Sequence, residues 1–295
     1  MSRYDSLILG QVSLDVNVDP AGQAVREVGG AVVASGFAAS ALGHKTCVLP
    51  KANLHEVDLA ALFSRAENVD VIPLASPRCT SIENVYQTAD KERRTCRAIS
   101  RIEPYRLDEM PDVDASVIHI AGLMRGDFGG EIIKWAAGRG QCALDVQCML
   151  RSAEGPEGIM AFHDWPEKQK YLPLIRFLKT DAAEAEILTG LSDRREAAKA
   201  LCGWGAKEVM ITHNTEVIVF DGERFAAEPL VPRNLSGRTG RGDTCFSAYI
   251  TERLTRPVGE ALLSAAALVS LKMETPGPFT GTRADVEAYI QAFYH

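Results

Sequence analysis

Short apolar runs that alternate with helical segments constrain the fold of this chain more than any other feature. The runs are rich in aliphatic and β-branched residues, as buried strands are. The predicted strands are 6–9, 46–49, 117–121, 142–146, 176–178 and 209–212. Helical spacing of apolar residues predicts helices at 31–42, 57–65, 131–137, 182–188 and 194–202. This alternation predicts a largely parallel sheet covered by helices on both faces, with ligands at the carboxyl ends of its strands.

Two stretches, 15–28 and 79–100, interrupt this alternation. They are richer in polar and β-forming residues and have no helical periodicity, so we expect them to form a small accessory sheet. The chain closes with a strand at 216–220 and helices near 243–254, 258–272 and 284–293. No Pro/Ser-rich linker divides the sequence. We therefore expect residues 1–295 to form one domain.

Composition and charge exclude some classes of partner. The net charge is −7, whereas nucleic acids and anionic membranes require clustered positive charge. The run Lys91, Glu92, Arg93, Arg94 is short and mixed in sign, and we interpret it as a solvated segment. No window approaches the roughly 20 apolar residues of a membrane span, and no secretory signal is visible. The seven cysteines form no Cys-x-x-Cys pair. Reduced thiols and a cytoplasmic location are expected.

A glycine-rich turn at 237–243 runs directly into an amphipathic helix. Its sequence is Gly-Arg-Thr-Gly-Arg-Gly-Asp. The first N–H groups of a helix lack internal partners, and glycines let a phosphate approach them closely. The helix dipole also favours negative charge at that end. Residues Gly240, Arg241 and Gly242 are therefore predicted to line an anion site that stabilises a phosphoryl group in transfer.

Asp243 ends this turn, and its presence needs a reason because a carboxylate repels a phosphate. It could act as a general base that takes a proton from an attacking alcohol, or it could simply cap the helix. The segment alone leaves both interpretations open. Other glycine motifs fit less well. No Lys follows Gly242, as a Walker A loop requires, and Cys245 stands where a dinucleotide fingerprint has its third glycine.

The turn resembles the C-terminal signature of ribokinase-like (PfkB) carbohydrate kinases, Asp-Thr-x-Gly-Ala-Gly-Asp, at Thr239, Gly240, Gly242 and Asp243. Other segments resemble the family in the expected order over nearly the whole chain. They are 10–15, Gly29-Gly30 with 31–43, 143–147, 177–186 and 210–212. The resemblance implies a three-layer α/β/α sandwich with a mainly parallel central sheet. It also implies a small β lid built from 15–28 and 79–100.

The resemblance assigns roles to residues at the matching positions. Asp243 would be the catalytic base, with 240–243 as the anion hole. The residues that would contact the substrate are Asp15, Gly29, Gly30 and Gln147. The residues that would line the nucleotide site are Thr212, Asn214, Thr239, Gly240 and Gly242. Asp181 and Glu184 would place magnesium, although acidic residues are favoured at the start of any helix.

The implied reaction is transfer of the γ-phosphate of ATP, with Mg²⁺, to a hydroxyl of a sugar or polyol. Segments 144–147, with Leu150-Arg151, and 177–179 most resemble the subgroup that includes plant myo-inositol kinases, which points to a cyclic polyol or an unusual sugar. Lid closure would exclude water and suppress hydrolysis. In relatives the lid often packs against a second subunit, so a homodimer through the lid is expected.

Several positions depart from the family pattern. Gly237 replaces the first Asp of the signature, in a region that helps bind a monovalent cation in some relatives, so potassium activation is left open. Arg241 replaces Ala and could clamp a phosphate or point to solvent. Asp181 replaces Asn but keeps a hard oxygen ligand. Ala34 stands where an Asn usually contacts a sugar hydroxyl.

These departures keep two alternatives open. One is a nucleoside kinase of the same fold. The other is a regulatory protein that binds a sugar or nucleotide and has lost transfer. A hydride-transferring dehydrogenase is disfavoured because the dinucleotide glycine pattern is absent.

Overall fold

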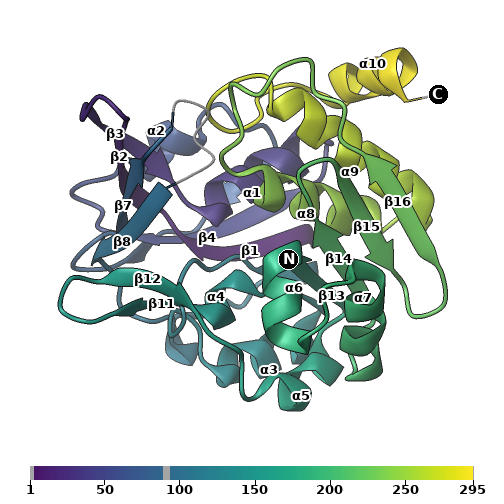
Figure 1. The fold of residues 1–295 in the computed structure, drawn as a ribbon, viewed down its shortest axis with the longest axis horizontal. Helices are drawn as coiled ribbons and strands as arrows, with labels where there is room; N and C mark the ends of the chain where they lie inside the picture. Colours follow the sequence, from purple (N-terminus) through teal and green to yellow (C-terminus); the bar gives the residue numbers. More distant parts are fainter. Residues whose placement is uncertain (1–2, 89–93, 295) are drawn as a thin grey trace.

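A ten-stranded sheet forms the centre of the part of the chain that this computed structural model describes, residues 3–88 and 94–294 (Figure 1). In spatial order its strands are β16 (Phe225–Pro229), β15 (Glu216–Phe220), β14 (Glu208–Thr212), β13 (Phe177–Asp181), β10 (Gln141–Asp145), β9 (Ala115–Ile120), β1 (Tyr4–Gln11), β4 (Thr46–Ala52) and β5 (Val69–Val71), with β6 (Leu74–Ala75) also paired to β4. All pairs from β14 to β5 are parallel, and β15 and β16 are antiparallel.

Helices cover both faces of this sheet (Figure 1). The helices on one face are α1 (Ala31–Ala41), α2 (Leu59–Phe63), α8 (Arg241–Glu252), α9 (Val258–Lys272) and α10 (Arg283–Phe293). Those on the other face include α3 (Gly130–Arg139), α5 (Lys168–Tyr171), α6 (Ala182–Thr189) and α7 (Arg194–Gly203). Successive side chains of β9 enter different cores: Val117 packs with α8 and α9, and Ile118 packs with α3. The predicted α/β/α sandwich with a mainly parallel sheet is confirmed.

A second sheet of six strands lies at one side of the sandwich, at the left of Figure 1. Its strands, in spatial order, are β11 (Arg151–Glu154), β12 (Ile159–Phe162), β8 (Arg94–Ser100), β7 (Ser81–Tyr86), β2 (Ser13–Val18) and β3 (Ala24–Gly29). We call it the lid sheet. The sequence patterns did not reveal β11 and β12, because each has four residues and a polar turn separates them.

Part of the predicted lid segment 79–100 lies outside the described residues, as do Lys91, Glu92 and Arg93 of the charged run. Short connecting helices complete the architecture: α4 (Gln147–Leu150), a 3₁₀ turn at Leu107–Glu109 and another at Leu172–Leu174. In the described ranges, no helix is long and apolar enough to span a lipid bilayer.

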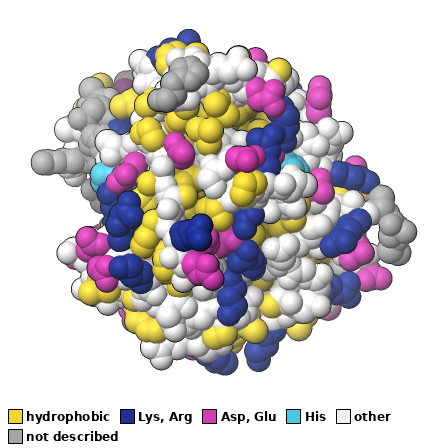
Figure 2. Space-filling model, turned by 90° about the vertical axis from the view of Figure 1, so that its right-hand side faces the viewer, with side chains coloured by type: hydrophobic (Ala, Val, Ile, Leu, Met, Phe, Trp, Pro, Cys, Tyr) yellow, Lys and Arg dark blue, Asp and Glu magenta, His cyan; other side chains and the backbone are white. Residues whose placement is uncertain are grey.

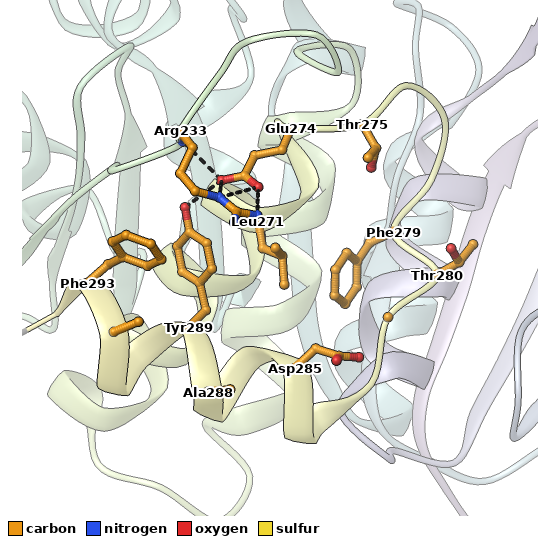
Figure 3. A pocket seen from close by; sticks show the side chains of 12 residues that line it. Arg233, Leu271, Glu274, Thr275, Phe279, Thr280, Asp285, Ala288, Tyr289 and Phe293 are labelled. Carbon is orange, nitrogen blue, oxygen red and sulfur yellow. Dashed lines mark hydrogen bonds and ion pairs between the residues drawn. The ribbon is translucent and has the colours of Figure 1, made fainter.

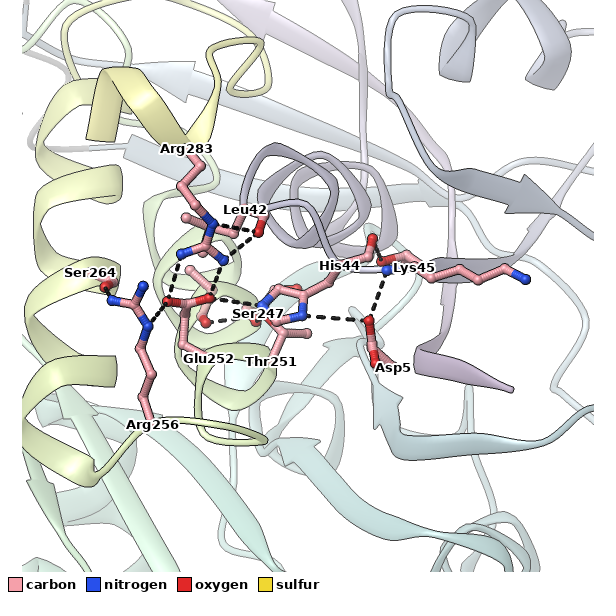
Figure 4. A network of polar contacts seen from close by, with 12 residues as sticks. Asp5, Leu42, His44, Lys45, Ser247, Thr251, Glu252, Arg256, Ser264 and Arg283 are labelled. Atoms are coloured by element: carbon pink, nitrogen blue, oxygen red, sulfur yellow. Dashed lines mark hydrogen bonds and ion pairs between the residues drawn. The ribbon is translucent and has the colours of Figure 1, made fainter. Parts of the chain in front are cut away.

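The buried carboxylate of Glu252 fixes the last turn of α8 in the core (Figure 4). It receives His44 Nε2 at 2.8 Å, Arg256 Nε at 3.0 Å and Arg283 Nη2 at 2.6 Å. Burial alone would raise the pKa of Glu252, but the bonds to His44 and Arg283 outweigh it and lower the pKa to about 2. Because these partners come from the loop after α1 and from α10, the direction of α8, and hence the position of its N-terminus, is set by the core.

A shallow hollow between α9 and α10 lies on the face away from the lid sheet. Figure 2 shows hydrophobic side chains gathered near the top of this face, with acidic and basic side chains around them. In the close view of Figure 3, Arg233 and Tyr289 point to the carboxylate of Glu274, with the Tyr289 hydroxyl donating at 2.7 Å. The site residues predicted from the sequence do not line this hollow. They lie at the carboxyl-terminal edge of the central sheet.

Candidate active site

Two adjoining pockets meet at the N-terminus of α8. The first, which we call the outer pocket, lies over the ends of β13 and β14 and the turn at 235–243. The second, the lid pocket, lies between the lid sheet, the start of α1 and the same turn. The residues that line both pockets are Tyr86, Arg94, Gln147, Ser236, Thr239, Gly240 and Asp243. Asp243 therefore sits where a group could pass from a molecule in one pocket to a molecule in the other.

The glycine turn begins α8 in the way that the sequence predicts for an anion site. Gly240 is the N-cap, with a φ of 76° that favours glycine, and no side chain caps the helix. Its free N–H groups are therefore available to a ligand. The interpretation of Asp243 as the cap is wrong, because Asp243 lies inside the first turn. A Cβ at Gly242 would lie 3.3 Å from Lys179 Nζ, so a side chain there would press on this lysine.

The first turns of α1 and α8 pack directly on each other. A Cβ at Gly240 would lie 3.3 Å from the Cβ of Ala34, and the Ser247 hydroxyl donates to the carbonyl of Ser35 at 2.7 Å. The small side chain at Ala34, where the family has an Asn, thus leaves room for the glycine turn. Two motifs that lie about 200 residues apart in the sequence meet in this way at one edge of the sheet.

A buried ion pair lies beneath the turn. Lys179 Nζ, on β13, is 3.0 Å from Asp145 Oδ2 at the end of β10 and 3.9 Å from Glu184 Oε2. Burial alone would lower the pKa of Lys179, but the carboxylates of Asp145, Glu184 and Asp243 outweigh it and raise the pKa. Lys179 therefore keeps a positive charge at the floor of the outer pocket, where phosphate oxygens would lie.

Asp243 has the electrostatic character of a general base. Burial, and then the nearby carboxylate of Asp145, raise its pKa to about 6, although Lys179, Arg151 and Lys272 act in the opposite direction. A carboxylate with a raised pKa is a stronger base than a solvated one and is still ionised at neutral pH. Its position between the two pockets and its basicity suit removal of a proton from a hydroxyl group.

The double glycine opens the lid pocket beside Asp15. A Cβ at Gly29 would lie 3.1 Å from Asp15 Oδ2, so the missing side chain leaves this carboxylate accessible. Gly30 has a φ of 113°, and a Cβ there would lie 2.3 Å from the carbonyl oxygen of Gln11. Only glycine fits at this second position. Asp15 accepts the N–H of Ile82 at 3.2 Å, and burial raises its pKa.

The remaining predicted residues divide between the pockets. Gln147 lines both pockets, and Thr212, Asn214 and Thr239 line the outer pocket. Arg241 also lines the outer pocket, where its guanidinium donates to the Asn214 side chain. Arg241 is partly exposed, and its role as a phosphate clamp stays a prediction.

The two predicted magnesium ligands differ in their surroundings. They form a capping box at the start of α6, in which each carboxylate accepts the backbone N–H of the other residue at 2.8 Å. Asp181 lines the outer pocket, whereas Glu184 is buried beside Lys179. Mg²⁺ commonly takes one or two protein carboxylates and completes its shell with water and substrate phosphates. Asp181 fits that role, and for Glu184 it stays a prediction.

The cationic residues that line the pockets but were not assigned to the site from the sequence are Arg94, Arg151, Lys179, Arg238 and Lys272. Arg94 is exposed at the start of β8, as expected of a strand end, and it also lines both pockets. Arg151, at the start of β11, lines the lid pocket and is 8% exposed. Lys179 gave a sequence signal, because a lysine within a buried strand needs a partner. For Arg151 the sequence leaves open whether the side chain faces the substrate or the surface, and the structure places it in the lid pocket. Arg94 gave no signal of a site.

Comparison with known proteins decides the family. No protein-family model matches the chain. A pyrophosphate-dependent kinase of the ribokinase family, solved with sulfate, is 36% identical and superposes with a TM-score of 0.87, over 96% of this chain and 99% of that one. The chain is a member of the ribokinase family. It is therefore a kinase, a phosphotransferase of the sugar, polyol or nucleoside class, as predicted.

Three further proteins are similar to this chain. A pyrophosphate-dependent kinase solved with a pyrophosphate analogue and myo-inositol is 35% identical, with a TM-score of 0.86 over 96% of this chain and 99% of that one. The cytidine kinase of Thermococcus kodakarensis is 24% identical over 265 residues, which are 83% of this chain and 87% of that protein. A ribokinase of Arabidopsis thaliana, at 15% identity and a TM-score of 0.75 over 98% of this chain and 99% of that one, shares the fold.

The raised pKa of Asp243 leads to a prediction about pH. The base acts when deprotonated, so kcat/KM should fall about tenfold per pH unit below about 6 and stay level above it. Asp243→Asn should lower kcat by roughly 10²–10⁴-fold and abolish this limb. The exposed Asp108→Asn variant serves as the control and should keep the parent profile. Initial rates from pH 4.5 to 8.5 measure this, and an Asp243→Asn variant with the parent rate would contradict the assignment.

Proposed function

We propose that this protein transfers a phosphoryl group from pyrophosphate to a hydroxyl of an inositol-like cyclic polyol. The observation that carries the proposal is the Arg241 side chain, which crosses the outer pocket to Asn214. The resemblance of the sequence motifs to ribokinase-like carbohydrate kinases suggests ATP as the donor. ATP is therefore the alternative that the experiment below must exclude. Mg²⁺ as the metal, Asp243 as the base and the turn at 240–243 as the anion site remain parts of the proposal.

The charge of the outer pocket and the contact of Arg241 with Asn214 favour a compact anionic donor. Lys179, Arg238 and Arg241 line it together with the glycine turn, and these groups suit phosphate oxygens. Arg241 starts on α8, and Asn214 follows the end of β14, so their contact crosses the path on which a nucleoside would extend beyond its phosphates. Pyrophosphate has no nucleoside and needs no such path. The relatives at 34–36% identity are pyrophosphate-dependent kinases.

The lid pocket favours a neutral acceptor that is rich in hydroxyl groups. The buried guanidinium of Arg151 has neither a hydrogen bond nor an ion pair within residues 3–88 and 94–294. Among the carboxylates of the pocket wall, that of Asp15 attracts the charge of Arg151 most strongly. A buried donor without a partner is unfavourable unless a ligand supplies one. A hydroxyl both donates and accepts, so adjacent hydroxyls can satisfy Asp15 and Arg151 together. The relative at 35% identity was solved with myo-inositol.

In the proposed reaction, Asp243 takes the proton of the acceptor hydroxyl as its oxygen attacks the phosphorus. The N–H groups from Gly240 to Asp243 and the ammonium of Lys179 stabilise the charge on the transferred group. Asp181 would hold Mg²⁺, which neutralises charge on the phosphates when it is bound. The lid sheet would shield the site from water and so suppress hydrolysis of the donor.

The outer face of the lid sheet supports the proposed homodimer. Strand alternation places Asp15 and Asn17 of β2 toward the pocket and Leu14, Val16 and Val18 away from it. Exposed apolar residues on this outer face are Val85 (37%), Ile99 (52%) and Ile159 (42%), and the Arg97–Glu83 ion pair lies on the same face. Apolar side chains spread over three strands favour an interface. A second copy of this chain is the proposed occupant.

The donor assignment predicts which phosphate compound supports turnover. With Mg²⁺ and a panel of inositols, sugars and nucleosides, pyrophosphate should give a kcat/KM at least about tenfold above that of ATP. Arg241→Ala should lower turnover with pyrophosphate and reduce the preference over ATP. Arg139→Ala, at an exposed position on α3, is the matched control.

Turnover with ATP alone would overturn pyrophosphate as the donor, and nucleosides as the best acceptors would indicate a nucleoside kinase. Binding without turnover, with Asp243→Asn unchanged, would indicate a regulatory protein.

The acceptor assignment predicts a specific behaviour of Arg151→Met. Losing the hydrogen bonds should raise the KM for the polyol by about 10²-fold. Because Met replaces a buried charge without a protein partner, the ligand-free protein should keep or raise its Tm. Arg139→Met controls for the loss of an arginine. Calorimetric melting with and without myo-inositol, together with initial rates, measures both effects. A lower Tm with an unchanged KM would mean that Arg151 is only a structural residue.

The interface assignment predicts that charge on the outer lid face separates the subunits. Val85→Lys combined with Ile99→Lys should convert a dimer into monomers, because two ammonium groups would be buried without partners. Leu191→Lys, at another exposed apolar position, should not change the assembly state. Analytical ultracentrifugation at micromolar concentration measures the mass. A monomeric parent protein would refute this interface.

A further inference from the structure

Lys272, the last residue of α9, places a buried ammonium against the phosphate-binding turn. Its side chain is 1% exposed, and Nζ donates to the carbonyl oxygen of Gly237 at 2.5 Å and to that of Thr239. Among the described residues no carboxylate forms an ion pair with it. Its hydrogen-bonded partners are therefore backbone carbonyls of the turn that begins α8.

A buried ammonium without a carboxylate partner destabilises the folded protein, so its presence needs a functional reason. Burial lowers the pKa of Lys272 to about 8, and the nearby Asp243 carboxylate only partly offsets this. Replacing a buried charge with an apolar side chain commonly leaves a fold as stable as before or more stable. Folding alone therefore does not explain a lysine at this position.

The geometry of the peptide bond connects Lys272 to the anion site. In a trans peptide the C=O and the following N–H point in opposite directions. When the carbonyl of Thr239 turns to the ammonium, the N–H of Gly240 must face the other side of the turn. Gly240 lines both pockets. The ammonium thus holds the first peptide of the anion site in one orientation, and its charge adds to the positive end of the helix.

The packing around Gly237 explains why no acidic residue stands at the start of the turn. A Cβ there would lie 1.7 Å from the carbonyl oxygen of Thr275, and the Gly237 N–H donates to the carbonyl of Met273 at 2.8 Å. The turn is pressed on the end of α9, where an Asp side chain has no room. The carbonyl oxygens of Gly237 and Thr239, which could otherwise coordinate a free cation, accept hydrogen bonds from Lys272.

We propose that the ammonium of Lys272 is a built-in cation that positions the phosphate-binding turn, so that phosphoryl transfer by this protein requires no free monovalent cation. Lys272 is a positioning residue, because it acts through the peptides of the turn. This inference rests on the kinase activity of the family and is independent of which donor and acceptor are correct.

The first test uses the unmodified protein. Initial rates are measured with the donor and acceptor pair that supports turnover, in buffers whose only monovalent cation is K⁺, Na⁺ or tetramethylammonium, at constant ionic strength. The rates should agree within about twofold. An increase of about tenfold or more with K⁺ over tetramethylammonium would overturn the proposal. A result that favours ATP or a nucleoside would change the donor or acceptor assigned above but would leave this test intact.

The second test replaces the ammonium. Lys272→Met, which keeps most of the volume, should lower kcat by about 10²-fold. Lys272→Ala leaves space beside the two carbonyls, and K⁺ or NH₄⁺ should restore part of its activity while tetramethylammonium, which is too large, should not. The exposed Lys199→Ala variant is the control and should show no cation dependence. Pyrophosphate should raise the Tm of Lys272→Met less than that of the parent. Loss of activity in Lys272→Ala without cation-specific recovery would reduce Lys272 to a structural residue and overturn the proposal.

Discussion

The position of the N-terminus of α8 is the constraint on which the whole site depends. At its far end the helix is held by buried Glu252 with His44, Arg256 and Arg283, and at its near end by Ala34, Lys179 and Lys272. Free N–H groups can hold a phosphoryl group only if they stay aimed at one point, since preorganised dipoles are what make such a site effective. The core supplies this rigidity, and glycines at 240 and 242 supply the open approach.

Carboxylates and cations lie close together around the N-terminus of α8 and shift one another's pKa. Asp145 and Glu184 neutralise Lys179 below the turn, and Asp243 stands among cations at the junction of the two pockets. Burial keeps the pKa of Asp243 raised, and the surrounding cations keep that carboxylate ionised at neutral pH. Removing any one member would shift the others, because charges interact more strongly in this buried setting than in water. A change of charge at Asp243 would therefore also change the electrostatic potential at the glycine turn, and the reverse.

The lid sheet has two faces with different chemistry, and this difference follows from strand alternation. One face brings Asp15, Arg94 and Arg151 into the lid pocket, and the other carries apolar side chains toward the outside. A single sheet can thus close the pocket and, in the proposed dimer, join two subunits. Residues that meet in the pocket come from both halves of the chain, so the acceptor site exists only when the lid sheet is assembled.

The sequence by itself determined the alternating fold, the glycine turn and the double glycine, because each depends on local spacing or on a backbone conformation that few residues adopt. It also singled out Asp243, Asp15 and Gln147 as site residues. Only the tertiary structure decided that Arg241 reaches Asn214 and that Arg151 and Lys272 are buried cations without carboxylate partners among the described residues. Such contacts join segments that are distant in the chain, and the hairpin of β11 and β12 is too short to leave a periodic signal. Burial and pairing depend on packing, which no local pattern specifies.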